Sequence, residues 1–290
     1  MMPMLQWQSV SLVRRIHCLA WILALTPGWL QGAERHHAIY VMKEDGSQAR
    51  KLVQVDGYAD HAAPRWSPDG KQVMFSATDP NSRTSDLFVI NADGTGLRKL
   101  GQGARADWSP DGKQIAFDDG REIFVQNLDG QGRERVSTGR GPRWSPDGSQ
   151  MAFVEDSMLY TIDFVTGQRR ALFAQPFALL YRGVCWSPDG RHIALVAQPV
   201  QGPRRQLLIV SSQGSDHGVR ARLQTEGGMS SSPSFSPDGK KLAYSAAYLI
   251  MIVEVDPTRR PRMPPGQKHR NFEPDWSPDG QWLLFTSNRE

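Results

Sequence analysis

The sequence predicts an all-β fold, a six-bladed β-propeller with four-stranded antiparallel blades, from three observations. A five-residue phrase, Trp66-Ser67-Pro68-Asp69-Gly70 in its first copy, occurs six times. The copies lie 42, 36, 42, 49 and 41 residues apart, a period typical of propeller blades. The intervals between them carry strand patterns and no helical period, and the two chain ends hold complementary parts of one repeat. The later copies begin at Trp108, Trp144, Trp186, Phe235 and Trp276.

The first 33 residues have the order of a secretory leader. The basic pair Arg14-Arg15 precedes an apolar core from Ile16 to Leu25, and the small residues Gly32-Ala33 follow. This core is shorter than the ~20 apolar residues of a membrane-spanning helix. We therefore expect an exported chain, with a signal peptide or an uncleaved anchor over residues 1–33 and a single propeller domain over residues 37–290.

Charge and cysteine content exclude several classes of protein. The chain has 34 basic and 30 acidic residues, a balance that does not call for nucleic acid or a lipid surface as a partner. Of the two cysteines, Cys18 lies in the leader and Cys185 in the body, so the exported chain would have no internal disulfide. A large core would replace the disulfides of a small secreted domain.

The first full repeat predicts a four-stranded meander. Ser67 to Gly70 forms a tight turn, because proline presets φ at its second position and glycine accepts the left-handed conformation at its fourth. The segment Lys71–Ala77 alternates as a strand, and Asp86–Asn91 is apolar on both faces, as in a covered strand. After the next turn, Leu97–Leu100 supplies the fourth strand.

The chain ends predict how the ring closes. The third-strand phrase also occurs before the first motif, at Ile39–Met42, and Arg50–Val53 follows it. The last motif is followed by one strand only, Gln281–Ser287. A ring sealed by pairing the two ends removes exposed sheet edges. We therefore expect the sixth blade to combine residues 37–54 with residues 272–288.

The motif side chains have a structural and a functional interpretation. The five motif tryptophans can pack blade against blade, since an aromatic side chain buries about 150–250 Å², or they can form a platform for stacking sugars. The motif aspartates can bond the turn backbone or hold a metal, and the turn position favours backbone bonding. These aspartates are Asp69, Asp111, Asp147, Asp189, Asp238 and Asp279.

The repeat resembles that of the TolB family. The resemblance rests on Trp-Ser-Pro-Asp-Gly-Lys followed by Ile-Ala-Phe and on an Ile-Tyr-Val-Met phrase before Asp-Gly, and it covers nearly all of residues 37–290. It implies a six-bladed periplasmic propeller that binds partner proteins, in TolB itself the peptidoglycan-associated lipoprotein. The α/β domain that precedes the TolB propeller has no counterpart in this sequence. Related repeats occur in prolyl-oligopeptidase-like enzymes and oligogalacturonate lyases.

Motifs of common enzymes are absent from the sequence. It contains no Gly-x-Ser-x-Gly, no His-Glu-x-x-His and no phosphate loop. We therefore expect no catalytic residue, no metal and no cofactor. Two alternatives stay open. A polysaccharide lyase or hydrolase would need His61 and His269 to converge on a channel metal, and a soluble ligand sensor would need a pocket.

The candidate binding residues lie just before each motif, where the copies diverge. A position with a purely structural role would have no reason to vary, so these residues predict a mixed-charge mouth of the central channel. The alternative is a set of solvated or mutually paired charges. The expected partner is a protein or peptide of the cell envelope, bound by a monomeric propeller with no direct membrane insertion. The predicted partner-binding residues are His61, Arg65, Arg105, Asp107, Arg143, Arg182, His269, Arg270, Glu273 and Asp275.

Overall fold

The computed structural model describes residues 37–173, 177, 179–198, 205–214, 219–223 and 230–289. Residues 36–290 form one compact unit. The leader expected over residues 1–33 lies outside the described residues.

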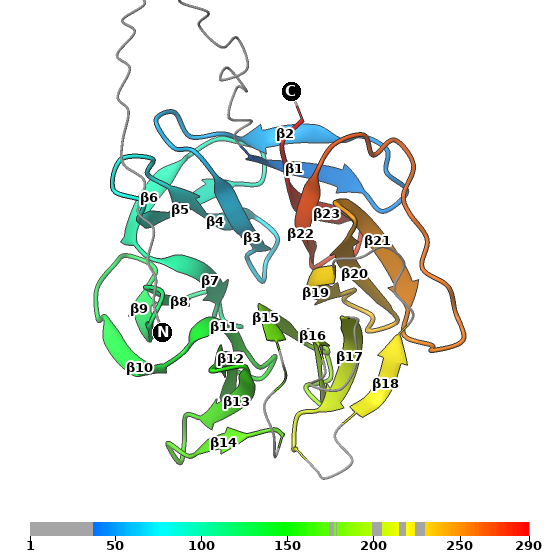
Figure 1. Ribbon diagram of the computed structural model, residues 1–290. Helices are drawn as coiled ribbons and strands as arrows, with labels where there is room; N and C mark the ends of the chain where they lie inside the picture. Colours follow the sequence, from blue (N-terminus) through cyan, green and yellow to red (C-terminus); the bar gives the residue numbers. More distant parts are fainter. Residues whose placement is uncertain are drawn as a thin grey trace, which may run out of the picture. The chain divides into compact units, whose positions relative to one another are not determined.

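Six antiparallel sheets surround a central axis, and their strand order confirms the six-bladed β-propeller (Figure 1). No helix occurs among the described residues. Blade 1 comprises β3 (His61–Trp66), β4 (Gln72–Thr78), β5 (Ser85–Asn91) and β6 (Arg98–Gln102). Blade 2 comprises β7 (Ala104–Trp108), β8 (Gln114–Asp118), β9 (Glu122–Asn127) and β10 (Glu134–Thr138). Blade 3 comprises β11 (Arg140–Trp144), β12 (Gln150–Glu155), β13 (Met158–Asp163) and β14 (Arg169–Ala171). Blade 4 comprises β15 (Leu179–Trp186), β16 (His192–Gln198), β17 (Gln206–Ser211) and β18 (Val219–Leu223).

Blade 5 has three full strands, and two short contacts stand in the place of its fourth. The strands are β19 (Ser230–Phe235), β20 (Lys241–Ala246) and β21 (Leu249–Glu254). Arg262 forms a two-way backbone bridge to Ile252, and the side-chain amide of Gln267 bonds the N–H and C=O of Ile250. The segment between β21 and the first strand of the next blade carries Pro257, Pro261, Pro264 and Pro265. Proline lacks the N–H that a strand ladder needs.

Blade 6 closes the ring with both chain ends, as the sequence predicts. It comprises β2 (Arg50–Val53), β1 (Ala38–Lys43), β23 (Trp282–Ser287) and β22 (Asn271–Trp276), in that order from the outside inward. Strand β1 pairs along its whole length with β23, with Tyr40 opposite Phe285. The N-terminal strands thus supply the outer half of a blade whose inner half is C-terminal.

The motif turns share one hydrogen-bond pattern. In the first copy, Ser67 Oγ donates to Asp69 Oδ1 and accepts from Gln72 N, while Asp69 Oδ1 also accepts from Lys71 N. The same bonds recur at the other five motifs, so these aspartates bond within their turns. Each motif glycine lies at positive φ against the motif proline of the preceding blade, as Gly112 does against Pro68. The six turns therefore interlock around one face of the ring, which we call the motif face.

The core consists of layers between neighbouring blades. Phe235 and Tyr244 of blade 5, for example, form one buried cluster with Leu207 and Ile209 of blade 4. Trp108, Trp186 and Trp276 are buried in such layers, and Trp66 and Trp144 are half-buried beside others. Because burying a large apolar side chain stabilises a fold by about 1.5–3 kcal/mol, these layers hold adjacent blades together.

We predict that Asp147→Ala lowers the free energy of unfolding by about 1 kcal/mol at neutral pH. Bonds from the Ser145 hydroxyl, the Ser149 N–H and the Ser149 hydroxyl hold the pKa of the Asp147 carboxyl below its usual range. Such a group stabilises the fold above its unfolded pKa, and this stability is lost as pH falls through the lower folded pKa. Urea titrations of both proteins at pH 7 and about pH 2.5 should show the difference shrinking with acid. An unchanged difference would contradict the prediction.

Candidate functional site

The first strands of the six blades line the channel, and each contacts its neighbours in a closed ring (Figure 1). Each of these strands ends at its motif aromatic, and the residue just before that aromatic lies near the motif face. Two of these residues from different blades pair directly, with Arg65 Nη1 3.7 Å from Asp275 Oδ1. Ser234 Oγ donates to the same carboxylate oxygen at 3.1 Å. We call the six residues the channel ring: Arg65, Asp107, Arg143, Cys185, Ser234 and Asp275.

The two arginines of the channel ring are buried. Arg65 is 6% exposed and Arg143 is 5% exposed, and each donates from Nη1 to the carbonyl of the proline before it. Burial first, and then the neighbouring Arg65 charge, lower the pKa of Arg143 to about 10. Burial also raises the pKa of the Cys185 thiol to about 12, so this cysteine is protonated and unreactive at neutral pH.

The acidic and hydroxyl residues of the channel ring connect neighbouring blades. Asp275 Oδ2 accepts the backbone N–H of Trp66 at 3.0 Å, and Asp107 Oδ2 accepts that of Trp144 at 2.8 Å. Ser234 Oγ accepts the N–H of Trp276 at 3.2 Å. Burial raises the pKa of both aspartates, while Arg65 and Arg143 act in the opposite direction.

Where the channel ring carries arginine, the connection between blades has another form. Arginine has no acceptor, and here the tryptophan indole of the next blade donates to the arginine backbone carbonyl instead. Trp108 Nε1 bonds the Arg65 carbonyl at 3.4 Å, and Trp186 Nε1 bonds the Arg143 carbonyl at 3.0 Å. The variation before each motif therefore corresponds to two ways of joining blades. Arg65 and Asp275 pair with each other, as the alternative interpretation of these charges expects. That these residues contact a partner stays a prediction.

A second set of connections lies three residues before each motif aromatic, where the first strand carries a bulge. Arg105 has a φ of 51° there, and its Nε donates to Asp118 Oδ2 at 2.8 Å. Asp118 also accepts the N–H of Gly141 in the next blade at 2.9 Å. Glu273, with a φ of 53°, accepts the N–H of Ala63 at 2.6 Å. Arg105 and Glu273 thus use their side chains within the ring wall.

The remaining predicted residues divide between the interior and the surface. His61 is fully buried, its Nε2 accepts the N–H of Val55 at 2.8 Å, and its ring stacks on Phe75. His269 and Arg270 are exposed. Arg182 lies in β15, and its side chain is outside the described residues.

The convergence of histidines that a channel metal enzyme would need is not found in the described part of the chain. His61 is buried, whereas His269 is exposed at the surface. The described residues contain no group of three or more His, Cys, Asp or Glu side chains arranged to hold a metal ion. Nor does the described chain contain a helix long and apolar enough to cross a bilayer.

One cluster combines the predicted Arg270 with three residues that were not predicted from the sequence. The connections that precede the first strands, together with the hairpins between second and third strands, form the end of the ring opposite the motif face, which we call the loop face. There the Arg270 guanidinium lies 4.8 Å from the centre of the Tyr248 ring, which meets Phe272 edge to face at 5.6 Å. Phe272 meets His37, also at 5.6 Å, and His37 Nδ1 lies 2.7 Å from Asp60 Oδ1. We call Arg270, Tyr248, Phe272 and His37 the aromatic shelf.

Tyr248 of the aromatic shelf is held in a strained conformation. It is 40% exposed and has a φ of 67° in a two-residue hairpin, next to Ala247 at 47°. Bulky residues rarely adopt positive φ, and such turns favour Asn-Gly. The Asn271 N–H bonds the Tyr248 carbonyl at 2.8 Å and fixes the hairpin to blade 6. In the sequence, this hairpin is a two-residue loop, Ala247-Tyr248, that contains neither glycine nor asparagine. This signal could have marked Tyr248 as a strained residue.

The loop face also has a basic cavity of about 470 Å³ across blades 1 to 3. Arg83, Arg105 and Arg140 line it together with Asp118 and Asp119. Arg105 pairs with Asp118, and Arg140 Nε donates to the Gly120 carbonyl. Arg83 and Arg140 are exposed. The loop face therefore presents cationic side chains over blades 1 to 3 and aromatic rings at the aromatic shelf.

Comparison with known proteins confirms the resemblance to TolB propeller repeats. Residues 28–157 match the family model described as the TolB beta propeller domain. A search of the curated proteins found no match.

Solved structures share the fold. A putative TolB from Agrobacterium tumefaciens has a TM-score of 0.69 at 21% identity, over 87% of this chain and 98% of that one. TolB from Acinetobacter baumannii has a TM-score of 0.59 at 19% identity, over 87% of this chain and 63% of that one. Hydrazine synthase from Kuenenia stuttgartiensis has a TM-score of 0.53 at 18% identity, over 79% of this chain and 92% of that one. Because the identities are this low, the structural similarity shows a common fold alone.

Proposed function

We propose, from the premise that this chain is a TolB-like β-propeller, that it is a non-catalytic scaffold that binds a protein or peptide partner. The TolB-like fold supports a scaffold or binding role. A rigid ring that presents variable loops at one end requires no catalytic group for such a role.

The observation that carries this proposal is the aromatic shelf on the loop face. Tyr248 is exposed, strained at positive φ and covered on one side by Arg270. Tyrosine and arginine are enriched among the residues that dominate binding energy. Strained backbone conformations cluster at functional sites, which favours Tyr248 as a contact residue. The partner would contact the aromatic shelf and extend toward the basic cavity beyond the channel opening.

The same proposal places the protein in the periplasm as a monomer. The basic pair and the short apolar core within residues 1–33 support export. Of the predicted binding residues, Arg270 belongs to the aromatic shelf, and His269, the residue before it, is also exposed. Arg65, Asp107, Arg143 and Asp275 would act indirectly, by holding the blades that carry the loops.

We predict that Tyr248→Ala weakens partner binding about 30-fold or more, the effect of losing a residue worth at least about 2 kcal/mol. Immobilised wild-type and variant proteins would be incubated with an envelope extract, and the dissociation constant would then be measured for each protein that the wild type retains.

The matched control is Phe164→Ala. Phe164 is an aromatic residue of similar exposure, 38%, in a turn on the motif face, where it stacks on Trp144. A partner of the loop face is retained by the wild type and by Phe164→Ala and is lost with Tyr248→Ala. Equal retention by all three proteins, with unchanged thermal unfolding, would overturn the proposal.

A further inference from the structure

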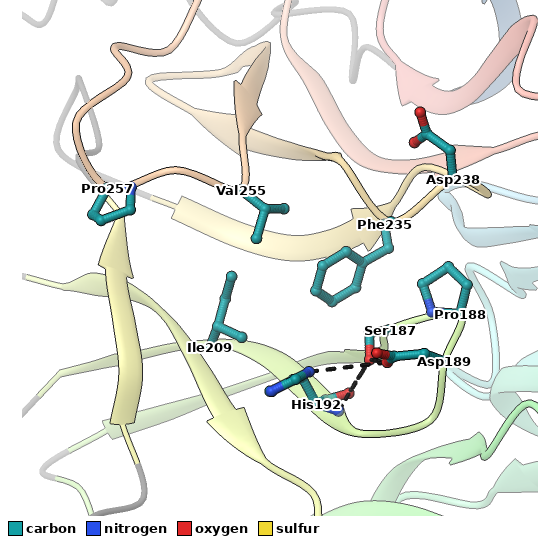
Figure 2. Close-up of a pocket in the computed structure, with 10 residues that line it drawn as sticks. Ser187, Pro188, Asp189, His192, Ile209, Phe235, Asp238, Val255 and Pro257 are labelled. Atoms are coloured by element: carbon teal, nitrogen blue, oxygen red, sulfur yellow. Dashed lines mark hydrogen bonds and ion pairs between the residues drawn. The ribbon is translucent and has the colours of Figure 1, made fainter.

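A cleft of about 450 Å³ separates blades 4 and 5 on the motif face (Figure 2). Blade 4 contributes its motif turn with Asp189, and His192 and Ile209 from its second and third strands. Blade 5 contributes Phe235 and its motif turn with Asp238, and the close-up shows both walls facing the same space. The cleft lies at the opposite end of the ring from the aromatic shelf.

The same cleft occurs between blades 6 and 1, where its volume is about 510 Å³. Nine lining positions correspond one to one between the two clefts, with the motif turns as the common frame. Trp66 stands in the place of Phe235, and Trp282 in the place of His192. The tenth lining residue differs in kind, because it is Arg50 between blades 6 and 1 and Pro257 between blades 4 and 5.

Arg50 is one of four arginines that occupy the same register position in different blades. In each blade, the second-strand residue eight places after the motif aromatic pairs with a residue of the third strand. The register position in question is the residue that pairs with this third-strand residue from the outer side. These pairs are Arg50 with Val41, Arg98 with Val89, Arg170 with Thr161, and Arg262 with Ile252. The guanidinium of each arginine crosses to the next blade. The acceptors are the carbonyls of Ala92, Leu128 and Gln213 and the carboxylate of Glu44.

Two blades depart from this pattern: blade 2, which has Glu134 opposite Val125, and blade 4, which borders the cleft in question. In blade 4 the residue opposite Ile209 is Ala221, which stands beside a register shift and between Arg220 and Arg222. Val255 of blade 5 corresponds to Ala92 of blade 1, since the N–H of each bonds the carbonyl of the lysine after its motif glycine. The chain therefore repeats the guanidinium-accepting cleft between blades 4 and 5 without supplying the arginine from that register position.

The chemistry of the cleft fits the group that the pattern leaves out. Phe235, Ile209 and Val255 provide apolar surface for an alkyl stem. Asp189 and Asp238 stand on opposite rims, and hydrogen bonds from the motif serines hold the pKa of both carboxyls below the usual range. His192 Nδ1 lies 3.9 Å from Asp189 Oδ1, and Arg191 and Lys240 follow the two motif glycines.

We propose that the cleft between blades 4 and 5 binds an alkylguanidinium group, placed as Arg50 is placed between blades 6 and 1. The stem would lie against Phe235 and Ile209, and the guanidinium would donate to the carbonyl of Val255, which corresponds to the Ala92 carbonyl that Arg50 reaches. The carboxylates of Asp189 and Asp238 line the same cleft and would add a favourable charge interaction. The group can come from a small guanidine compound or from an arginine side chain of a peptide, because the chemistry is the same.

The test uses n-butylguanidinium as the probe and the exported chain, residues 34–290, as the protein. Amide chemical shifts of Phe235 and Val255 should change saturably with probe concentration. The variant Ala221→Arg supplies the chain's own guanidinium at the missing register position, so probe affinity should fall at least about tenfold. Glu134→Arg adds an arginine at the same position of blade 2 and should leave probe affinity unchanged.

Three further measurements identify what the cleft recognises. Asp238→Asn should weaken probe binding about two- to five-fold, as for one partly exposed ion pair, and uncharged 1-pentanol should bind more weakly than the probe. A capped Ala-Arg-Ala peptide that binds more tightly than n-butylguanidinium would assign the cleft to peptides, and equal or weaker binding would assign it to small guanidines. Non-saturable shifts, equal binding of 1-pentanol, or unchanged affinity in a folded Ala221→Arg protein would overturn the proposal.

Discussion

Replacing Asp118 with alanine is expected to lower the free energy of unfolding by about 3–5 kcal/mol, as when one partner of a buried ion pair is removed. Asp118 is fully buried and pairs through both oxygens with the Arg105 guanidinium. It also accepts the N–H groups of Gly120 and Gly141 at 2.9 Å each. The variant would leave a largely enclosed cation and two N–H groups without acceptors, one of them in the neighbouring blade. Equilibrium unfolding in urea measures the loss.

The neighbouring residue offers a matched control for this prediction. Asp119 is exposed and accepts only the N–H groups of Arg121 and Glu122 within its own hairpin. We expect Asp119→Ala to cost about 1 kcal/mol. Similar losses for the two variants would show that the inter-blade bonds of Asp118 contribute little.

Replacing Asp275 with alanine is expected to cost a similar 3–5 kcal/mol. The carboxylate accepts the Trp66 N–H and the Ser234 hydroxyl and lies 3.7 Å from Arg65, which is 6% exposed. These contacts join blades 5, 6 and 1 beside the seam where the chain ends meet. The loss should appear in urea unfolding and in faster exchange of the Trp66 amide.

A single and a double variant separate the contribution of the Asp275 charge to stability from that of its hydrogen bonds and packing. Asp275→Asn keeps an acceptor for Trp66 but removes the charge that faces Arg65, so it should cost less than Asp275→Ala. The pair Arg65→Met with Asp275→Leu removes both charges and should recover much of the stability, because apolar residues can replace a buried ion pair at little cost. If Arg65→Met restores nothing to Asp275→Leu, the two side chains are not coupled.

The fold was predictable because each blade repeats one local pattern. The turn at Ser67 to Gly70 and the strands around it follow from dihedral preferences and period-2 hydrophobicity. Ring closure followed from a count of strands, since Ile39–Met42 and Gln281–Ser287 each lacked partners along the chain. The fourth strand of blade 5 was harder to predict from the sequence. In its place, Arg262 and Gln267 make isolated hydrogen bonds to β21, and this described segment forms no strand.

The candidate site was predictable only in part. Divergence before the motifs singled out Arg65, Arg143 and Asp275 as partner-binding residues, and this role stays a prediction. The burial of the two arginines did not follow from the sequence, because a strand residue can face the channel, its wall or solvent, and a bulge in the first strand changes that direction. Of the aromatic shelf, only Arg270 was among the predicted residues. Tyr248 lies in a hairpin, His37 precedes β1 and Phe272 lies near the start of β22, so these positions share no period.

The sequence alone determined the number of blades, the turn chemistry and the composite sixth blade, since these depend on local geometry and on strand pairing. The tertiary structure decided which residues meet across blades. Asp118 and Gly141, or Arg50 and Ala92, are 23 and 42 residues apart and touch only when the ring has closed. It also decided that Ala221 stands opposite Ile209, at the register position that carries an arginine in four other blades, because register positions become comparable only when all blades share one axis.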